Sequence, residues 1–103
     1  MSDIKRDIIL AFVRVHLLHH AAEAPIYGLE MIQELGRHGH TLSPGTLYPI
    51  LHSLEKSGCL SSERRLIGGR YRKYYVITAL GLETVESLRE SVRELVNEVA
   101  PQK

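Results

Sequence analysis

The positively charged side chains of this chain are concentrated in one short segment. Residues 58–77 contain five cations and a single anion, Glu63, although the formal net charge of all 103 residues is only +1. A dense group of cations attracts phosphates through its local field, whatever the total charge of the protein. We therefore expect Arg70 and Arg72, which would share one strand face near Gly68-Gly69, to contact the phosphates of double-stranded DNA or to enter its minor groove, with Arg64, Arg65 and Lys73 as supporting charge. The simpler alternative is a solvated surface loop.

A second group of polar and small residues precedes this basic segment. Ser43 and Pro44 are residue types that begin a helix, a capping hydroxyl followed by a proline at the first helical position. The free N–H groups at such a helix start suit a phosphate, and side chains of the first turns can reach base edges in a major groove. The predicted DNA-binding residues here are Ser43, Pro44, Gly45, Thr46, Tyr48 and His52. The simpler alternative is that Ser43 only caps the helix and Tyr48 packs against the basic segment.

Histidines form the third group, with six in the chain. His16, His20 and Glu23 are separated by four and three residues, so they can share one face of a helix. Imidazole and carboxylate groups are ligands of zinc and other transition metals. The alternative is a set of partly exposed or core histidines near a dimer seam, since helical spacing often aligns such residues by chance. No cofactor is required by the sequence, and a transition metal is a hypothesis at this point.

Three helices are predicted ahead of the basic segment. The first begins at Ser2 or Asp3 and carries apolar residues at alternating spacings of four and three. The second covers about residues 28–37, and the third begins at Pro44. Thr41 and Leu42 are compatible with a very short strand between them. The residues expected to face inward are Leu29, Ile32 and Leu35 in the second helix and Leu47, Ile50, Leu51 and Leu54 in the third.

A β-hairpin and a final helix complete the predicted order. Residues 60–67 and 70–77 are typical of two strands, and Gly68-Gly69 is a two-residue turn that hairpins prefer. Thr78 caps a helix with a heptad seam too short to be stable alone in water. We therefore expect homodimerisation through Val85, Leu88, Val92, Leu95 and Val99. The alternative is that this helix packs only in the core of its own chain. The predicted fold is mainly α with a small β-hairpin, a winged helix-turn-helix over residues 1–77 and one C-terminal dimerisation helix over 78–103, in one compact unit.

Composition excludes several other classes of protein. The apolar stretch at residues 8–13 ends at Arg14, so it is too short for a membrane span or the core of a signal peptide. Cys59 is the only cysteine, which excludes an internal disulfide and fits a reducing compartment, the cytoplasm. No nucleophile, base and orienting group occur together at a recognisable spacing, so an enzyme is not expected.

Several short motifs also occur together in a fixed order. They are Tyr27-Gly28, the run from Ser43 to Leu51, Leu54-Glu55, Gly58, Gly69-Arg70, Tyr74-Tyr75, Ile77-Thr78 and Gly81. Over about residues 5–95 this set resembles the PadR family of bacterial transcription regulators, and the short final helix resembles the compact branch of that family.

The resemblance implies a homodimeric repressor that reads a pseudo-palindromic operator and responds to an effector. It also implies that the final helix packs on the first helix of the partner, which assigns Ile4, Ile8 and Val15 to the interface. A winged-helix module that binds an acidic protein is one alternative function. A metal-responsive regulator that uses the histidines of the first helix is another.

Overall fold

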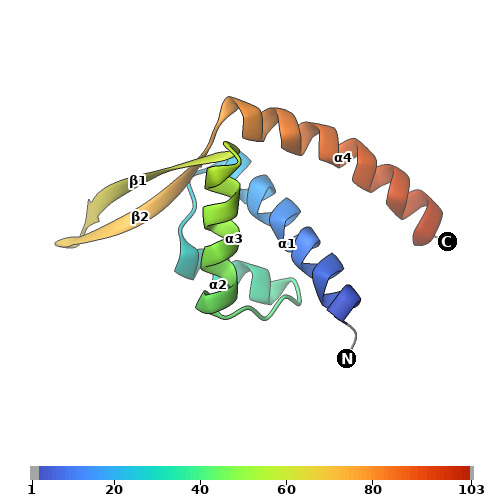
Figure 1. Ribbon diagram of the computed structural model, residues 1–103, viewed down its shortest axis with the longest axis horizontal. Helices are drawn as coiled ribbons and strands as arrows, with labels where there is room; N and C mark the ends of the chain where they lie inside the picture. The colour runs from blue at the N-terminus through green and yellow to red at the C-terminus, as the bar shows by residue number, and fades with distance from the viewer. Residues whose placement is uncertain (1–2, 103) are drawn as a thin grey trace.

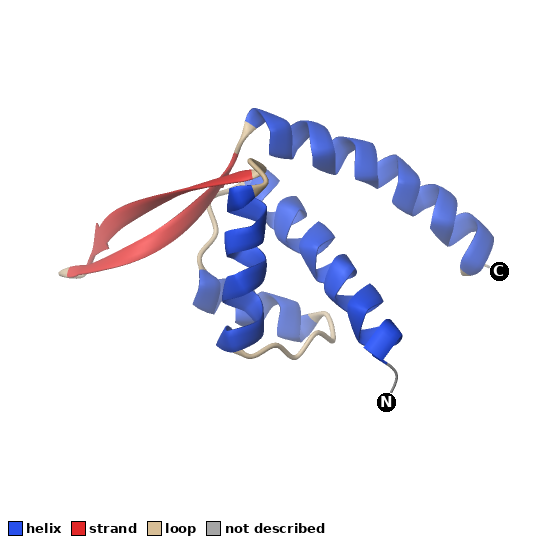
Figure 2. Cartoon of the chain, in the orientation of Figure 1, coloured by secondary structure: helices blue, strands red, loops and turns tan. Residues whose placement is uncertain are grey.

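The computed structural model describes residues 3–102, which form four helices and one hairpin (Figures 1 and 2). The order is α1 (Asp3–Glu23), α2 (Gly28–Arg37), α3 (Pro44–Lys56), β1 (Leu60–Ile67), β2 (Arg70–Ile77) and α4 (Ala79–Val99). This is the predicted order of helix, helix, helix, hairpin and helix, so the predicted fold class is confirmed. Ser2, one of the two predicted caps of α1, lies outside the described residues.

Local sequence explains where α3 and α4 begin. Ser43 has an extended backbone and Pro44 takes the first helical position of α3. The Ser43 hydroxyl does not cap the backbone as predicted, because it is 3.3 Å from the Thr46 hydroxyl instead. At α4 the predicted cap is present, since the backbone N–H of Gly81 donates to Thr78 Oγ1 over 3.0 Å.

The hairpin has the predicted strands and turn. All eight residues of β1 pair antiparallel with β2, from Leu60 opposite Ile77 to Ile67 opposite Arg70. Gly68 and Gly69 both have positive φ, 58° and 81°, which two-residue hairpin turns require and which glycine adopts without steric cost. The hairpin is tied to the helices at its base, where Ile26 and Tyr75 exchange backbone hydrogen bonds of 3.0 and 2.7 Å.

The core lies where α1, α2 and α3 meet the base of the hairpin and the start of α4. The four predicted inward residues of α3 are all buried. The prediction that Leu29 faces inward is wrong, because this residue is 58% exposed. Met31 and Leu35 are the buried residues of α2. Gly28 is buried at the start of α2, so the inward face runs through residues 28, 31 and 35. The predicted strand at Thr41 and Leu42 is also absent, since both lie in an irregular loop.

Two parts of the molecule project from this core (Figure 1). The hairpin extends to one side, and the C-terminal half of α4 extends toward the opposite side, where both chain ends lie. α1 packs against α4, β2 and α2, and α2 packs against α3. Within residues 3–102, no helix combines the length and the apolar character needed to cross a membrane.

Candidate nucleic-acid interface

The predicted recognition residues lie on the exposed side of α3. Leu47, Ile50 and Leu51 face the core, whereas Tyr48 and His52 are exposed on the opposite face. Ser43, Pro44 and Gly45 are also exposed at the start of the helix. The backbone N–H groups of this first turn and the side chains of the next turn are therefore accessible from one side of the molecule.

Tyr48 is positioned by the start of α2. A Cβ atom on Gly28 would collide with the ring and hydroxyl of Tyr48, so the glycine lets the ring lie against the α2 backbone. Tyr48 nevertheless remains 41% exposed. Tyr48 also lines a cleft of about 200 Å³ with Arg72 and Lys73 of the hairpin. The exposed face of α3 and the hairpin thus form one continuous surface.

Two of the five hairpin cations, both arginines, stack on Tyr27 and Tyr74, and Lys73 Nζ lies 5.2 Å from the ring centre of Tyr75. The Arg72 guanidinium lies 4.1 Å from the ring centre of Tyr27, and the Arg65 guanidinium lies 4.7 Å from that of Tyr74. The two tyrosine rings meet edge to face, 5.4 Å apart. Arg72 Nη1 also donates to the Tyr74 hydroxyl over 3.4 Å, and this hydrogen bond raises the pKa of Arg72 above its ordinary value. These stacked groups join the hairpin to the start of α2.

The other three cations differ in how far they are neutralised. Lys73 Nζ lies 3.9 Å from a carboxylate oxygen of Glu55 on α3. Arg64 and Arg70 are exposed and have neither an ion pair nor an aromatic partner within the described part of the chain. The strand register places Arg70 on the same hairpin face as Arg72, as predicted, and Arg64 on the other face.

Sequence reasoning missed three exposed residues near this surface. Arg6 of α1 donates to the Thr46 hydroxyl over 3.4 Å, which adds a cation at the start of α3. No sequence pattern joins two residues 40 positions apart. Leu66 and Tyr71 face each other near the hairpin tip and are 62% and 72% exposed. The sequence places both residues beside arginines of the strands, and this alternation could have indicated that they are exposed.

The predicted dimerisation residues separate into exposed and buried groups. Ile4 and Ile8 of α1 are exposed, as are Val92, Leu95 and Val99 of α4. Val85 needs correction, because it is only 1% exposed and belongs to the core of its own chain. Leu88 also packs partly against that core, and Val15 is half-buried. Val15, Val85 and Val92 line a cleft of about 420 Å³ between α1 and α4, together with His16, His19, Arg89 and Arg93.

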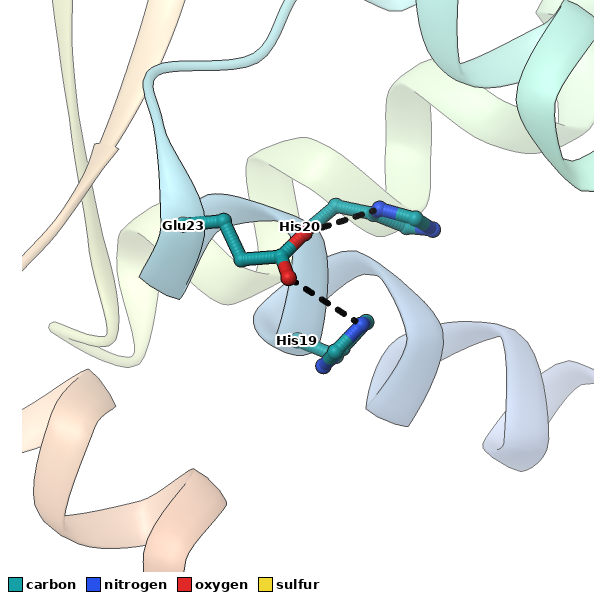
Figure 3. Close-up of side chains that lie close together, drawn as sticks. All are labelled: His19, His20 and Glu23. Atoms are coloured by element: carbon teal, nitrogen blue, oxygen red, sulfur yellow. Dashed lines mark ion pairs between the residues drawn. The ribbon is translucent and has the colours of Figure 1, made fainter.

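The histidines are grouped differently from the prediction. His20 and Glu23 lie near His19 at the end of α1, where the Glu23 carboxylate is 3.9 Å from a nitrogen of each histidine (Figure 3). His16 is not part of this group. Its ring lies 5.5 Å from that of His38 and 5.0 Å from that of His40. Burial and then the neighbouring histidines lower the pKa of His16, which favours its neutral form.

The structure also places Glu34 of α2, and His38 directly after α2, beside His20. His20, Glu34 and His38 have ligand atoms within 4.8 Å of one another. A hydrogen bond from His38 lowers the pKa of the Glu34 carboxyl, and Arg37 contributes in the same direction. Glu34 and His38 are four residues apart in sequence, a helical spacing that could have suggested the pair.

Three helices followed by a two-stranded wing define the winged helix-turn-helix class of DNA-binding domain. The chain belongs to the transcriptional regulator PadR-like family, which it matches over residues 17–87. It is 47% identical over 94 residues to the transcriptional regulator Rv3488 of Mycobacterium tuberculosis, with 91% of this chain and 88% of that protein covered. The chain is therefore a transcriptional regulator, a class that is not normally enzymatic.

Solved structures of relatives have the same fold. A PadR-like transcription factor from Bacteroides fragilis superposes with a TM-score of 0.80 at 29% identity, covering 96% of this chain and all of that one. A PadR-like regulator from Bacillus cereus gives a TM-score of 0.80 at 28% identity, covering 94% of this chain and 99% of that one.

Proposed function

We propose that this regulator is a homodimeric, sequence-specific repressor that binds double-stranded DNA in the cytoplasm. In this proposal α3 is the recognition helix in the major groove, and the wing contacts phosphates or the minor groove. The observation that carries the proposal is the shared cleft of Tyr48, Arg72 and Lys73. Because recognition helix and wing border the same cleft, one duplex can contact both.

The start of α3 is proposed to bind a phosphate. Its first N–H groups carry the positive end of the helix dipole, and Arg6 adds a full charge beside Thr46. Such a contact fixes the position of the helix in the groove without reading sequence. Sequence is then read by side chains further along the same face, of which Tyr48 and His52 are the candidates.

A pair of chains is proposed to bind a pseudo-palindromic operator. The exposed apolar residues of α1 and α4 supply a surface that a second copy can cover. Two-fold symmetry then places the two recognition helices on half-sites about one helical turn apart, or a multiple of it. A small effector in the cleft between α1 and α4 would lower DNA affinity by changing the separation of these helices.

The proposal is tested with the operator expected in DNA upstream of the protein's own gene. Fluorescence anisotropy should show tighter binding to this duplex than to an unrelated duplex of equal length. Tyr48→Ala should reduce that preference, since a good base contact is worth about 1–3 kcal/mol of discrimination. Tyr48→Phe is the matched control, because it keeps the ring against Gly28 and removes only the hydroxyl.

Equal affinity of the wild-type protein for both duplexes would contradict a sequence-specific repressor. It would favour the alternative of a protein-interaction module, which the exposed Leu66 and Tyr71 at the wing tip could serve. A loss of affinity for both duplexes in Tyr48→Ala, with the preference unchanged, would assign Tyr48 to packing alone.

A further inference from the structure

We propose that His20, Glu34 and His38 form a transition-metal site that joins α1 to the end of α2. Glu34 Oε2 lies 3.8 Å from His20 Nε2 and 3.0 Å from His38 Nε2. Two ligand atoms of a tetrahedral zinc ion, each about 2.0–2.1 Å from the metal, lie about 3.3 Å apart. Small side-chain rotations therefore bring all three atoms to coordination distance.

The strongest indication is an unsatisfied nitrogen. His20 Nε2 is buried and has no hydrogen-bond partner among residues 3–102. A buried nitrogen without a partner is unfavourable, and a metal ion would use its lone pair. The other ring nitrogen, Nδ1, lies 3.9 Å from Glu23, which resembles the outer carboxylate that orients many metal-binding histidines (Figure 3).

Glu34 is also held by Arg37 in a position suitable for binding a metal ion. Its Oε1 atom pairs with Arg37 Nη1, while Oε2 is the atom that faces both histidines. Arg37 therefore fixes the carboxylate without occupying the oxygen that a metal needs. On binding, the ion replaces the hydrogen bond between His38 and Glu34, and any proton on His38 Nε2 passes to solvent because the ligand is the neutral imidazole.

The group of His19, His20 and Glu23 is a weaker candidate for the same ion. Glu23 is 66% exposed in its side chain, against 24% for Glu34, and its distances to both histidines are 3.9 Å. The unsatisfied nitrogen of His20 also faces Glu34. Because both groups need His20, they are alternatives. Two imidazoles and one carboxylate favour zinc, cobalt or nickel over magnesium or calcium, and water or the nearby His16 can complete the coordination.

Such a site would connect the two surfaces of the regulator. α1 carries the proposed dimer surface, and α2 packs against the proposed recognition helix α3. A bound ion would fix the angle between α1 and α2, and so change DNA affinity. This consequence rests on the proposed function, whereas metal binding itself does not.

The experiment is a titration of the full chain, without DNA, by Zn²⁺ in a calorimeter and by Co²⁺ followed by visible absorption. One ion per chain and a raised melting temperature are expected. His38→Gln, at an exposed position, should weaken binding by more than about tenfold, because even loss of an outer-shell partner has effects of that size. His20→Gln should do the same, with its circular dichroism spectrum checked for folding. The control is Glu86→Gln on α4, an exposed carboxylate outside both proposed sites, which should bind Zn²⁺ as the wild type does.

Absence of both heat and a cobalt absorption band would overturn the site. So would binding that survives His38→Gln but is lost in His19→Gln, because that pattern assigns the ion to the end of α1. Anisotropy with the operator, with and without Zn²⁺, tests the connection to DNA. Metal binding with no change in DNA affinity would overturn that connection, while failure of DNA binding itself would overturn the proposed function and leave the site standing.

Discussion

At the scale of single residues, the five wing cations lie in different surroundings. Arg65 and Arg72 stack on tyrosines, and Lys73 lies near Glu55. Arg64 and Arg70 are exposed and without such partners in the described part of the chain. We infer that Arg64 and Arg70 supply most of the phosphate contacts. The stacked arginines, Arg65 and Arg72, hold the wing at its angle to α2.

Arg70→Ala should weaken binding to all duplexes alike. A dimer would lose two phosphate contacts, so the slope of log K against log salt should become flatter by about two. Stability should stay within about 0.5 kcal/mol of the wild type, because the side chain is exposed. Salt-titrated anisotropy and denaturant unfolding measure the two quantities.

Tyr27→Leu is the matched comparison for this prediction. It removes the ring under Arg72 and keeps every cation, so affinity should fall while the salt slope changes little. Hydrogen exchange of the wing amides should become faster, since an exposed cation–π contact contributes about 0.5–1 kcal/mol. If Tyr27→Leu flattens the slope as much as Arg70→Ala does, the division into contacting and holding residues is wrong.

At the scale of elements, the start of α4 is fixed by one close approach. A Cβ on Gly81 would collide with the carbonyl oxygen of Cys59, so only glycine lets α4 pack this closely on the start of the hairpin. The same turn is held by the Thr78 hydroxyl, which also donates to the Gly58 carbonyl. The direction of α4, and with it the proposed dimer surface, depends on this contact.

Gly81→Ala should therefore destabilise the protein by about 1–3 kcal/mol, the usual cost of overpacking. Gly36→Ala is the control in another helix, because its Cβ would meet no atom within 4 Å. It should stabilise by about 0.4–1 kcal/mol, since alanine restricts the unfolded chain. Urea unfolding of both variants gives the comparison, and equal stability of the two would contradict the packing argument.

The elements themselves could be predicted from sequence because their signals are local. Ser43-Pro44, Gly68-Gly69 and Thr78 each mark a boundary through their own backbone or capping chemistry. It was less predictable which apolar residues of a helix would be buried. Periodicity shows that Val85 and Val92 share one face of α4, but it does not reveal that α1 of the same chain covers Val85 while Val92 is left exposed.

The candidate sites were predictable only where their residues are neighbours in sequence. The exposed face of α3 and the wing cations, which we propose to bind DNA, are continuous segments, so composition was enough to predict where they lie. Arg6 beside Thr46 depends on the packing of α1 against the rest of the fold. His20 meets Glu34 because α1 packs on α2, and spacing along α1 alone suggested His16 in its place.

At the scale of the whole molecule, the single chain is more extended than its length requires. Its radius of gyration is 14.7 Å, against about 13 Å for a compact domain of 100 residues. The wing and the C-terminal half of α4 account for this shape (Figure 1). The outer part of α4 exposes Leu95 and Val99, at 50% and 69%, which supports a partner chain on this helix.

Leu95→Glu should convert the protein to monomers. A charge at a covered apolar position is costly, so light scattering at micromolar concentration should give the mass of one chain. Asn97→Glu adds the same charge to another face of α4 and should leave a dimer. A monomeric wild type would contradict the dimer, as would a Leu95→Glu variant that still has the dimer mass.

The most direct test of the central proposal is the salt dependence of wild-type binding to the upstream duplex and to an unrelated one. A dimer that neutralises about six phosphates predicts a slope of log K against log salt of about −5, with two chains per specific duplex. The preference for the upstream duplex should persist as salt is raised. An affinity that is insensitive to salt and equal for both duplexes would contradict a winged-helix regulator that grips phosphates with its wing and reads sequence with α3.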